Sequence, residues 1–309
     1  FPRYQGYRIG MPLLKPWQVK NFDIIHVHTP ATLGIIGIAL AKYYKIPVVG
    51  TFHTLLPEFA QYISFRGTEK ITKKFLWKYS SIFYSKCDVA IAPSNYIKKI
   101  LERHGIDDVA VVPTGIKIKK NKTSKKSLRK KYGFAKNDEI ILHVGRISKE
   151  KNIQFIMRSL KKILKGNLKL IITSDGPYRK QLEKLAGKNR NIVFTGFLNE
   201  KQLDDYYALA DVFVMASRSE TQGLTLLEAA LRGLPIVAYD SPVISEFVKE
   251  NRIGIVASSK NFSLKVRNVL HSNLRKKFKK NCALTARKYD ATRCANALLK
   301  VYRSLVNSP

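Results

Sequence analysis

The chain has 309 residues, 45% of them hydrophobic, which is enough for the cores of about two domains of ~150 residues each. No run of about 18 apolar residues occurs, which excludes a helix that spans a membrane. Lys and Arg number 56 and Asp and Glu 22, so the net charge of +34 favours anionic partners. Cys87, Cys282 and Cys294 are odd in number and far apart, which indicates unpaired thiols in a reducing compartment.

Short apolar stretches alternate with helical stretches along the chain. The first expected strands are residues 22–29, 46–52, 87–94 and 109–113, with helices at 33–44, 68–85 and 96–105. A second set of expected strands follows at 139–146, 168–176, 192–197, 211–217, 235–240 and 253–258, with helices such as 152–165, 179–186 and 200–210. Past residue 262 the chain is expected to be helical to its end.

Nearly continuous apolar strands that alternate with helices are typical of parallel sheets covered on both faces. The predicted fold class is therefore α/β, with two doubly wound domains. Between the two sets of strands, residues 117–131 are dominated by basic side chains and show no apolar period. This stretch is predicted to be a linker with a short helix at its end.

A loop, a helix start and two carboxylates occur together in the second half of the chain. Gly223 permits close approach of the backbone to a ligand, and the amides of Leu224 and Thr225 open a helix whose positive end suits a phosphate. Glu220 precedes the helix and Glu228 lies about one turn inside it, so both can meet hydroxyl groups. The pattern favours a polyol joined to a diphosphate. The alternative is that Glu220 caps the helix and Glu228 is a solvated helix residue.

Polar residues also follow two other strands of the second set. Gly145 and Arg146 end one of these strands, and Lys151 comes shortly after them. The turn after the next strand contains Asp175, Gly176 and Pro177. Because ligands of such sheets lie beyond the carboxyl ends of the strands, these loops are expected to converge on one crevice. There Arg146 offers a bidentate fork and Lys151 a compact charge to a diphosphate, although two cations taken alone would be surface residues.

These segments resemble the motifs of the family 4 retaining glycosyltransferases, which have the GT-B fold. Glu220 and Glu228 match the family's E-x7-E signature. Five further segments match its motifs in the family's order: HVHTP (26–30), GTFHTLLPEF (50–59), VVPTGI (111–116), HVGRISKEKN (143–152) and SDGP (174–177). Within the family, the motifs HTP, TFHTLLPE and PTGI most resemble the branch that glucosylates diacylglycerol from UDP-glucose.

The resemblance implies two Rossmann-like domains that face each other across a cleft. Residues 1–117 would form the acceptor-side domain and residues 118–288 the domain that binds a nucleotide sugar. A last helix in residues 289–309 would return to the first domain. The chain begins with Phe1, and the family's first strand and its glycine-rich loop are expected to be missing from it.

The resemblance also implies roles for single residues. Arg146 and Lys151 would hold the diphosphate, Glu228 the ribose hydroxyls and Glu220 the sugar hydroxyls, with amides near Gly223 on the phosphate or sugar. No D-x-D sequence occurs, so Arg146 and Lys151 are expected to replace a divalent cation electrostatically. We therefore expect no metal and no cofactor beyond the nucleotide-sugar donor.

Three histidines follow or lie within the first strands. The resemblance places His53 near the reacting carbon, whereas a lone histidine at a strand end is otherwise most often a structural hydrogen-bonding residue. His26 and His28 alternate on one strand face and could imitate a zinc pair, but no third ligand is evident. We interpret these two as core or cleft residues.

The helix expected at residues 68–85, together with Lys86, interleaves lysines with aromatic residues. These are Lys70, Lys73, Lys74, Lys78 and Lys86 with Phe75, Trp77, Phe83 and Tyr84. The composition suits a lipid headgroup layer, and the alternative is an amphipathic helix whose aromatic side chains face the core. No motif for sequence-specific nucleic-acid binding is present.

The predicted activity is a retaining hexosyltransferase that moves glucose from UDP-glucose to a lipid acceptor such as diacylglycerol. It is expected in the cytoplasm, in peripheral association with the anionic inner face of the cell membrane. One alternative is a GDP-mannose-dependent mannosyltransferase that acts on another lipid or glycan. The other is a basic protein that binds anions or membranes and keeps the fold without turnover. The acceptor, the processivity and the oligomeric state are left open by the sequence.

Overall fold

The computed structural model describes residues 17–307 except residues 18, 66 and 118–120. The chain divides into two compact units, which are described separately. Unit 1 takes the chain up to Gly115, residues 219–222 and the chain from Ala291 onward, and unit 2 takes the rest. From the sequence, the first domain was predicted to contain residues 1–117 and 289–309, and the second to contain residues 118–288. That prediction placed residues 219–222 in the second domain. In the structure that short segment belongs to unit 1 because its side chains form hydrogen bonds there, as described below.

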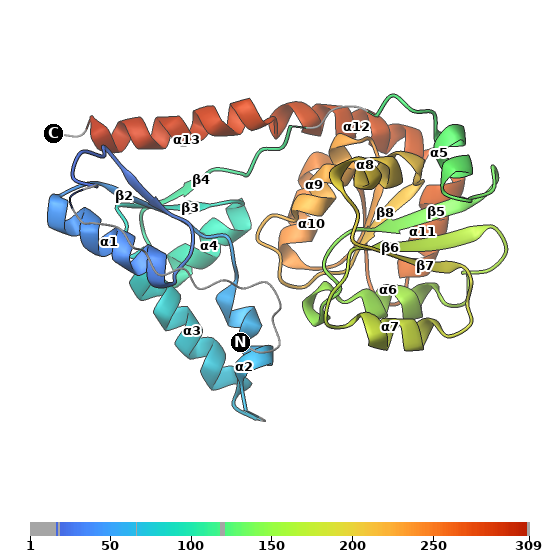
Figure 1. The fold of residues 1–309 in the computed structure, drawn as a ribbon, viewed down its shortest axis with the longest axis horizontal. Coiled ribbons are helices and arrows are strands. Elements are labelled where there is room, and N and C mark those ends of the chain that lie inside the picture. The colour runs from blue at the N-terminus through green and yellow to red at the C-terminus, as the bar shows by residue number, and fades with distance from the viewer. Residues whose placement is uncertain (1–16, 18, 66, 118–120, 308–309) are drawn as a thin grey trace. The chain divides into compact units, whose positions relative to one another are not determined.

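Unit 1 contains a four-stranded parallel sheet in the order β1-β2-β3-β4. Its strands are β1 (Ile25–Val27), β2 (Val48–Thr51), β3 (Val89–Ala92) and β4 (Val109–Val111). Its helices are α1 (Thr32–Tyr44), η2 (Leu56–Phe59), α2 (Ala60–Ile63), α3 (Glu69–Tyr84), α4 (Asn95–Arg103) and α13 (Ala291–Val306). The described strands follow chain order, so the helices between them cover one face of the sheet, and α13 lies along the other face (Figure 1).

Unit 2 contains a six-stranded parallel sheet in the order β10-β9-β8-β5-β6-β7. The strands are β5 (Glu139–His143), β6 (Leu168–Thr173), β7 (Ile192–Gly196), β8 (Val212–Met215), β9 (Ile236–Tyr239) and β10 (Gly254–Ala257). The helices are α5 (Lys125–Lys131), η3 (Lys149–Lys151), α6 (Ile153–Leu160), α7 (Arg179–Ala186), α8 (Glu200–Leu209), α9 (Leu224–Leu231), α10 (Pro242–Asn251), α11 (Phe262–His271) and α12 (Leu274–Lys288). The winding reverses between β5 and β8, which makes this sheet doubly wound.

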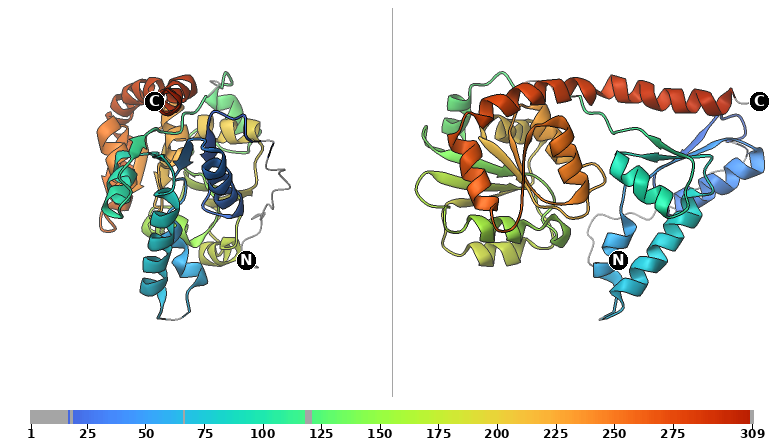
Figure 2. Two further views of the ribbon diagram at one scale, coloured as in Figure 1. Left: turned by 90° about the vertical axis from the view of Figure 1, so that its left-hand side faces the viewer. Right: turned by 180° about the vertical axis from the view of Figure 1, so that it is seen from behind.

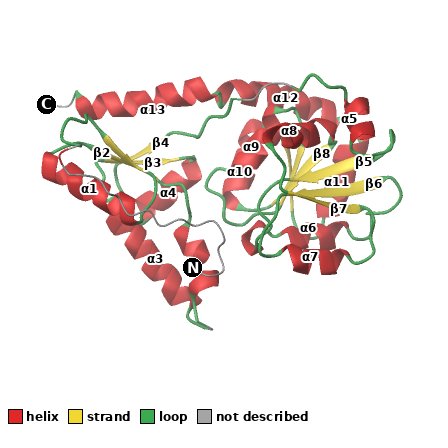
Figure 3. Cartoon of the chain, viewed as in Figure 1, coloured by secondary structure: helices red, strands yellow, loops and turns green. Residues whose placement is uncertain are grey.

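Two hydrophobic cores fill the two faces of the sheet in unit 2. Because successive side chains of a strand point to opposite faces, Ile140 and Leu142 enter one core and Ile141 enters the other. The first core lies under α8, α9, α10 and α12, and the second under α6, α7 and α11. The helices on either side of the strands can be followed in Figure 3, and from two further directions in Figure 2.

A buried ion cluster fastens α5 to the sheet of unit 2. The carboxylate of Asp211 accepts hydrogen bonds from Arg129 Nη2 at 2.7 Å and from Lys125 Nζ at 2.6 Å. It also accepts one from the Ile140 backbone amide at 2.8 Å, at the start of β5. The side chains of Asp211 and Arg129 are 8% and 10% exposed, so each charge depends on the other for compensation.

The structure resolves the question that the aromatic residues of α3 left open. Phe83 and Tyr84 are buried, and Trp77 stacks on the ring of His104 with the centroids 3.8 Å apart. Phe75 alone among the four faces solvent, with 67% of its surface exposed. The alternative in which the aromatic side chains pack inward is therefore confirmed for three of the four. Within the described part of the chain, no helix is both long and apolar enough to cross a membrane.

Candidate functional site

The loops after β5 and β6 pack backbone against backbone. The Ile147 amide donates to the Asp175 carbonyl oxygen at 3.0 Å, and the Tyr178 amide donates to the Ile147 carbonyl oxygen at 3.1 Å. A Cβ atom on Gly176 would lie 2.3 Å from the Ile147 oxygen, so glycine is required at this position. The turn predicted at residues 175–177, which ends in Pro177, is thus held against the loop that follows β5.

The carboxylate of Asp175 is engaged inside this turn. Its Oδ1 accepts from the Gly176 amide at 2.6 Å, and its Oδ2 accepts from Arg179 Nη1 at 3.1 Å. Arg179 Nε in turn donates to Glu183 at 2.7 Å. These contacts indicate that Asp175 stabilises the conformation of the loop. Any ligand at this loop would bind to that conformation.

The two cations predicted to hold a diphosphate follow β5. Gly145 has φ +151° and, with Arg146, opens the loop at the carboxyl end of the strand. Lys151 ends η3, and the Arg218 amide donates to the Glu150 carbonyl oxygen at 3.2 Å, which ties the chain beyond β8 to η3. Arg146 and Lys151 are both half-buried. A half-buried guanidinium and ammonium beyond a strand end suit the binding of a diphosphate.

Helix α9 begins at the same edge of the sheet. Its N-cap is Gly223, with φ +80° and ψ 61°, so the cap residue has no side chain to satisfy the first amides of the helix. Leu224, the first helical residue, is 43% exposed. The Thr225 carbonyl oxygen, at the next position, accepts a hydrogen bond from the Tyr207 hydroxyl at 3.2 Å. An uncapped helix start of this kind suits an anionic oxygen.

Glu228 lies one turn further along α9 and is half-buried. Its Oε2 accepts a hydrogen bond from the hydroxyl of Tyr207 on α8 at 2.8 Å. Tyr207 was not among the residues that the sequence singled out. It precedes Glu228 by 21 residues, and only the packing of α8 against α9 brings the two side chains together.

Strand order explains why these loops lie together. β8 is the direct neighbour of β5, and the winding of the sheet reverses between these two strands. Ligands of open α/β sheets bind beyond the carboxyl ends of the strands at such a reversal. We call this part of unit 2 the carboxyl edge. The structure brings to it the loops and the helix that carry Gly145, Arg146, Lys151, Asp175, Gly176, Pro177, Gly223, Leu224, Thr225 and Glu228.

The segment that carries Glu220 belongs to unit 1. Thr221 Oγ1 donates to the His53 carbonyl oxygen at 3.0 Å, and Ser94 Oγ donates to the Thr221 carbonyl oxygen at 2.9 Å. The next side chain, Gln222, pairs twice with the backbone of Thr114, at 2.8 and 2.9 Å. Glu220 is therefore on the same unit as His53, while its E-x7-E partner is on unit 2.

His53 is the end of a row of three histidines in unit 1. His53 Nε2 lies 2.9 Å from His28 Nδ1, and the ring centroid of His28 lies 4.1 Å from that of His26. The ring nitrogens of His26 form hydrogen bonds with the hydroxyl of Tyr302 on α13 at 2.6 Å and with that of Thr51 at 2.7 Å. The row joins the end of β2 to α13, a contact between residues 276 positions apart that the sequence did not indicate.

The environment of His26 and His53 favours their neutral imidazoles. Burial, followed by the neighbouring His28 and His53, lowers the pKa of His26 to about 4. Burial and then His28 also lower the pKa of His53. His53 is therefore neutral at pH 7, so it can donate or accept a hydrogen bond with a hydroxyl group.

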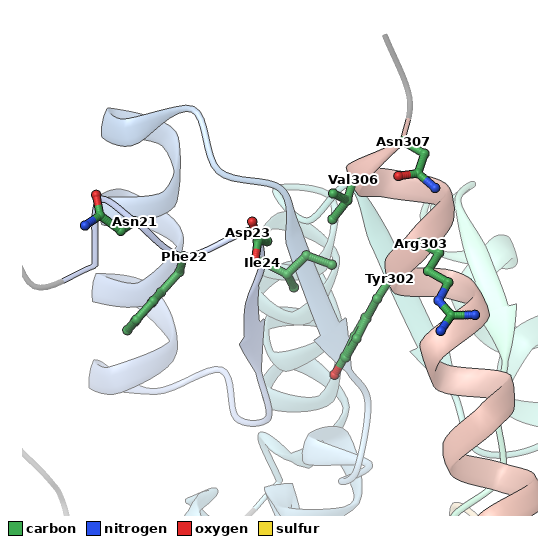
Figure 4. A pocket seen from close by; sticks show the side chains of 8 residues that line it. All are labelled: Asn21, Phe22, Asp23, Ile24, Tyr302, Arg303, Val306 and Asn307. Atoms are coloured by element: carbon green, nitrogen blue, oxygen red, sulfur yellow. The ribbon is translucent and has the colours of Figure 1, made fainter.

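Two pockets lie apart from the predicted site residues. One, of about 480 Å³, lies between the last turns of α13 and the residues that lead into β1 (Figure 4). Its wall includes Tyr302, the residue that also bonds to His26. The other, of about 530 Å³, lies in unit 2 between the end of α9 and α12. In the part of the chain that the structure describes, no group of three or more His, Cys, Asp or Glu could hold a metal ion.

The chain is similar to curated enzymes over most of its length. The alpha-monoglucosyldiacylglycerol synthase of Streptococcus pneumoniae is 33% identical over 264 residues, which cover 81% of this chain and 58% of the synthase. The GDP-mannose-dependent alpha-mannosyltransferase of Mycobacterium tuberculosis is 27% identical over 261 residues, which cover 83% of this chain and 66% of that enzyme. The chain thus spans less than two thirds of the length of each relative.

A solved structure shares the fold. The crystal structure of Anabaena Alr3699/HepE in complex with UDP-glucose matches with a TM-score of 0.78 at 18% identity, over 94% of this chain and 80% of that chain. Two parallel-sheet α/β units of the GT-B type were predicted from the sequence, and this fold class is confirmed.

Family comparisons match both halves of the chain. The family described as Glycosyltransferase Family 4 matches residues 2–120, and the family described as Glycosyl transferases group 1 matches residues 124–286. The resemblance inferred from the motifs is confirmed: the chain belongs to the group 1 and family 4 glycosyltransferases.

Proposed function

We propose that this chain is the catalytic part of a retaining, metal-independent glycosyltransferase that moves glucose from UDP-glucose to a lipid acceptor such as diacylglycerol. The observation that carries the proposal is the carboxyl edge of unit 2. There two half-buried cations, the uncapped start of α9 and the carboxylate of Glu228 gather at the reversal of the sheet. This combination offers positive groups to a diphosphate and a hydrogen-bond acceptor to a ribose.

Arg146, Lys151 and the first amides of α9 would act on the leaving group. When the bond between the sugar and the diphosphate breaks, negative charge grows on the departing oxygen. Fixed cations and amides stabilise that charge more strongly than water does, because they need not reorient during the reaction. Since these groups supply positive charge themselves, transfer is proposed to need no divalent cation.

Glu220 and His53 are proposed to act on the sugar. Both belong to unit 1, and the segment of Glu220 is fastened to the backbone of His53 through Thr221. A neutral His53 beside His28 can share a hydrogen bond with a sugar hydroxyl without placing a positive charge there. Glu220 is assigned to the sugar hydroxyls, and no enzymatic nucleophile is invoked.

The donor and the acceptor are proposed from relatives. The Streptococcus pneumoniae relative is named as a monoglucosyldiacylglycerol synthase, and the HepE structure contains UDP-glucose. The second candidate, mannose transfer from GDP-mannose, is favoured by the Mycobacterium tuberculosis relative.

A transfer assay tests the activity. The protein is incubated with diacylglycerol in vesicles, with UDP-glucose or GDP-mannose, and with EDTA or magnesium. We expect mass spectrometry to show a hexosyl-diacylglycerol formed from UDP-glucose at equal rates in EDTA and magnesium. The NMR coupling constant of the anomeric proton should show that the product retains the configuration of the donor. Transfer from GDP-mannose instead would favour the second candidate, and loss of transfer in EDTA that magnesium restores would contradict metal independence.

The membrane surface proposed for the acceptor is the outer face of α3. Ile71, Phe75 and Ile82 are 73%, 67% and 53% exposed, and their spacing places them on one face of the helix with Lys78. Phe65, in the turn before α3, is 86% exposed. We propose that these apolar side chains enter the headgroup layer of an anionic membrane while the lysines remain at its surface.

Replacement of Ile71 and Phe75 by glutamine is expected to reduce binding to anionic vesicles by about 100-fold or more, because each buried side chain of this size contributes about 1.5–3 kcal/mol. Sedimentation with phosphatidylglycerol vesicles measures the bound fraction. Leu264→Gln on α11 is the matched control, since Leu264 is 57% exposed on unit 2. Unchanged sedimentation of the double variant, or an equal loss in Leu264→Gln, would remove α3 from the proposal.

A further inference from the structure

A fully packed tyrosine holds the carboxylate of Glu228. Tyr207 is only 2% exposed, and its hydroxyl donates to Glu228 Oε2 at 2.8 Å, with a second acceptor, the Thr225 carbonyl oxygen, at 3.2 Å. Both acceptors lie on α9, so a single hydroxyl from α8 touches the first turn of α9 and the glutamate one turn further on. No hydrogen bond to the other carboxylate oxygen, Oε1, is found among the described residues.

Two neighbouring side chains pack against the ring that presents this hydroxyl. The guanidinium of Arg232 lies over the ring, 4.6 Å from its centroid. Arg232 itself is fixed by Asp204 at 2.7 Å and by the Glu228 carbonyl oxygen at 3.2 Å. The ring of Phe213, from β8, stacks near Tyr207 at a centroid distance of 6.2 Å. The hydroxyl therefore has little freedom to move away from Glu228.

The hydroxyl also stays protonated. Burial, and then the charge of Glu228, raise the pKa of Tyr207 well above its ordinary value. At any physiological pH the hydroxyl is a donor, and one proton donated to a carboxylate from a fixed point sets the plane of that carboxylate. A carboxylate oxygen has two lone pairs, so Glu228 keeps acceptor capacity on both oxygens for a vicinal diol.

We propose that Tyr207 is a positioning residue for nucleotide binding, which sets the orientation of Glu228 toward the two ribose hydroxyls of the donor. The proposal rests on the proposed function in taking Glu228 as the ribose-binding residue. It adds that affinity for the ribose depends on a hydroxyl buried in the core that the ligand itself does not contact. Without that hydroxyl Glu228 keeps its charge and loses its fixed orientation.

The test compares Tyr207→Phe with Tyr206→Phe. Tyr206 is the adjacent residue on α8, is 8% exposed, and makes no hydrogen bond through its hydroxyl among the described residues. Each variant loses one hydroxyl from the same helix. For each protein, calorimetry gives the dissociation constants of UDP and of 2′,3′-dideoxy-UDP. Their ratio measures recognition of the ribose hydroxyls, and it is independent of the fraction of protein that is folded.

The unaltered protein is expected to prefer UDP by about 100-fold, since two hydroxyls donate to a charged acceptor. Tyr207→Phe should lower this ratio about tenfold, and Tyr206→Phe should leave it within about twofold of the unaltered protein. In transfer assays Tyr207→Phe should raise KM for the donor with little change in kcat, because ribose binding is shared by the ground state and the transition state. An unchanged ratio in Tyr207→Phe, or an equal fall in Tyr206→Phe, would overturn the proposal.

Glu228→Gln separates this inference from the function on which it rests. If Glu228→Gln lowers the ratio and Tyr207→Phe does not, Glu228 still binds the ribose and Tyr207 does not position it. If Glu228→Gln leaves the ratio unchanged, the assignment of Glu228 to the ribose fails, and the role of Tyr207 fails with it.

Discussion

Replacing Arg146 by alanine is expected to lower kcat for glucose transfer by about 10²–10³-fold, the range found when one fixed donor to a developing charge is removed. Arg146 is half-buried in the loop that follows β5, beside the reversal of the sheet. A water molecule that takes its place must reorient as the diphosphate departs, and it carries no charge. Steady-state kinetics with UDP-glucose measures the change.

Two comparisons make the result specific. Arg146→Lys keeps the charge and loses the planar fork, so its activity should lie between those of the unaltered protein and Arg146→Ala. Arg158 is an exposed arginine on α6 of the same unit, and Arg158→Ala should change kcat by less than about twofold. Equal activity in Arg146→Ala and Arg158→Ala would show that Arg146 has no part in the reaction.

Replacing Asp211 by alanine is expected to destabilise unit 2 by about 3–5 kcal/mol, because it leaves the charge of Arg129 buried without compensation. The Ile140 amide at the start of β5 also loses its acceptor, and Lys125 loses its ion pair with Asp211. Urea unfolding followed by far-UV circular dichroism gives the free energy.

Asp211→Asn serves as the second variant, because it keeps the shape and removes the charge. It should lose most of the same stability if the charge of Asp211 is what compensates Arg129. Glu250→Ala is the control: Glu250 is exposed on α10, and its loss should change the free energy of unfolding by less than about 0.5 kcal/mol. A cost below about 1 kcal/mol for Asp211→Ala would contradict the role assigned to the cluster.

Local patterns in the sequence predict most of the strands and helices of the fold. The apolar runs at 139–146 and 211–217 predict β5 and β8 because buried parallel strands need apolar side chains on both faces. Gly223 and Gly233 flank the two ends of α9, and both glycines have a positive φ. From the order of strands and helices it followed that Arg146 and the start of α9 lie at the same end of the sheet.

Contacts between distant side chains could not be read from these patterns. Tyr207 meets Glu228, and Tyr302 meets His26, only because the helices that carry them pack onto particular faces. The grouping of residues 219–222 with unit 1 depends on hydrogen bonds to His53, Ser94 and Thr114. Local hydrophobic periodicity does not predict such hydrogen bonds. The stacking of Trp77 on His104 was likewise not predicted by any pattern in the sequence.

The central claim is that the carboxyl edge of unit 2 binds a nucleotide sugar through its diphosphate and its ribose. Calorimetric titration of UDP-glucose and GDP-mannose into the unaltered protein and into Glu228→Ala tests it directly. We expect UDP-glucose to bind the unaltered protein more tightly than GDP-mannose does, and Glu228→Ala to bind UDP-glucose at least about tenfold more weakly. Binding of neither nucleotide sugar by the unaltered protein, or equal binding of UDP-glucose by both proteins, would contradict the account.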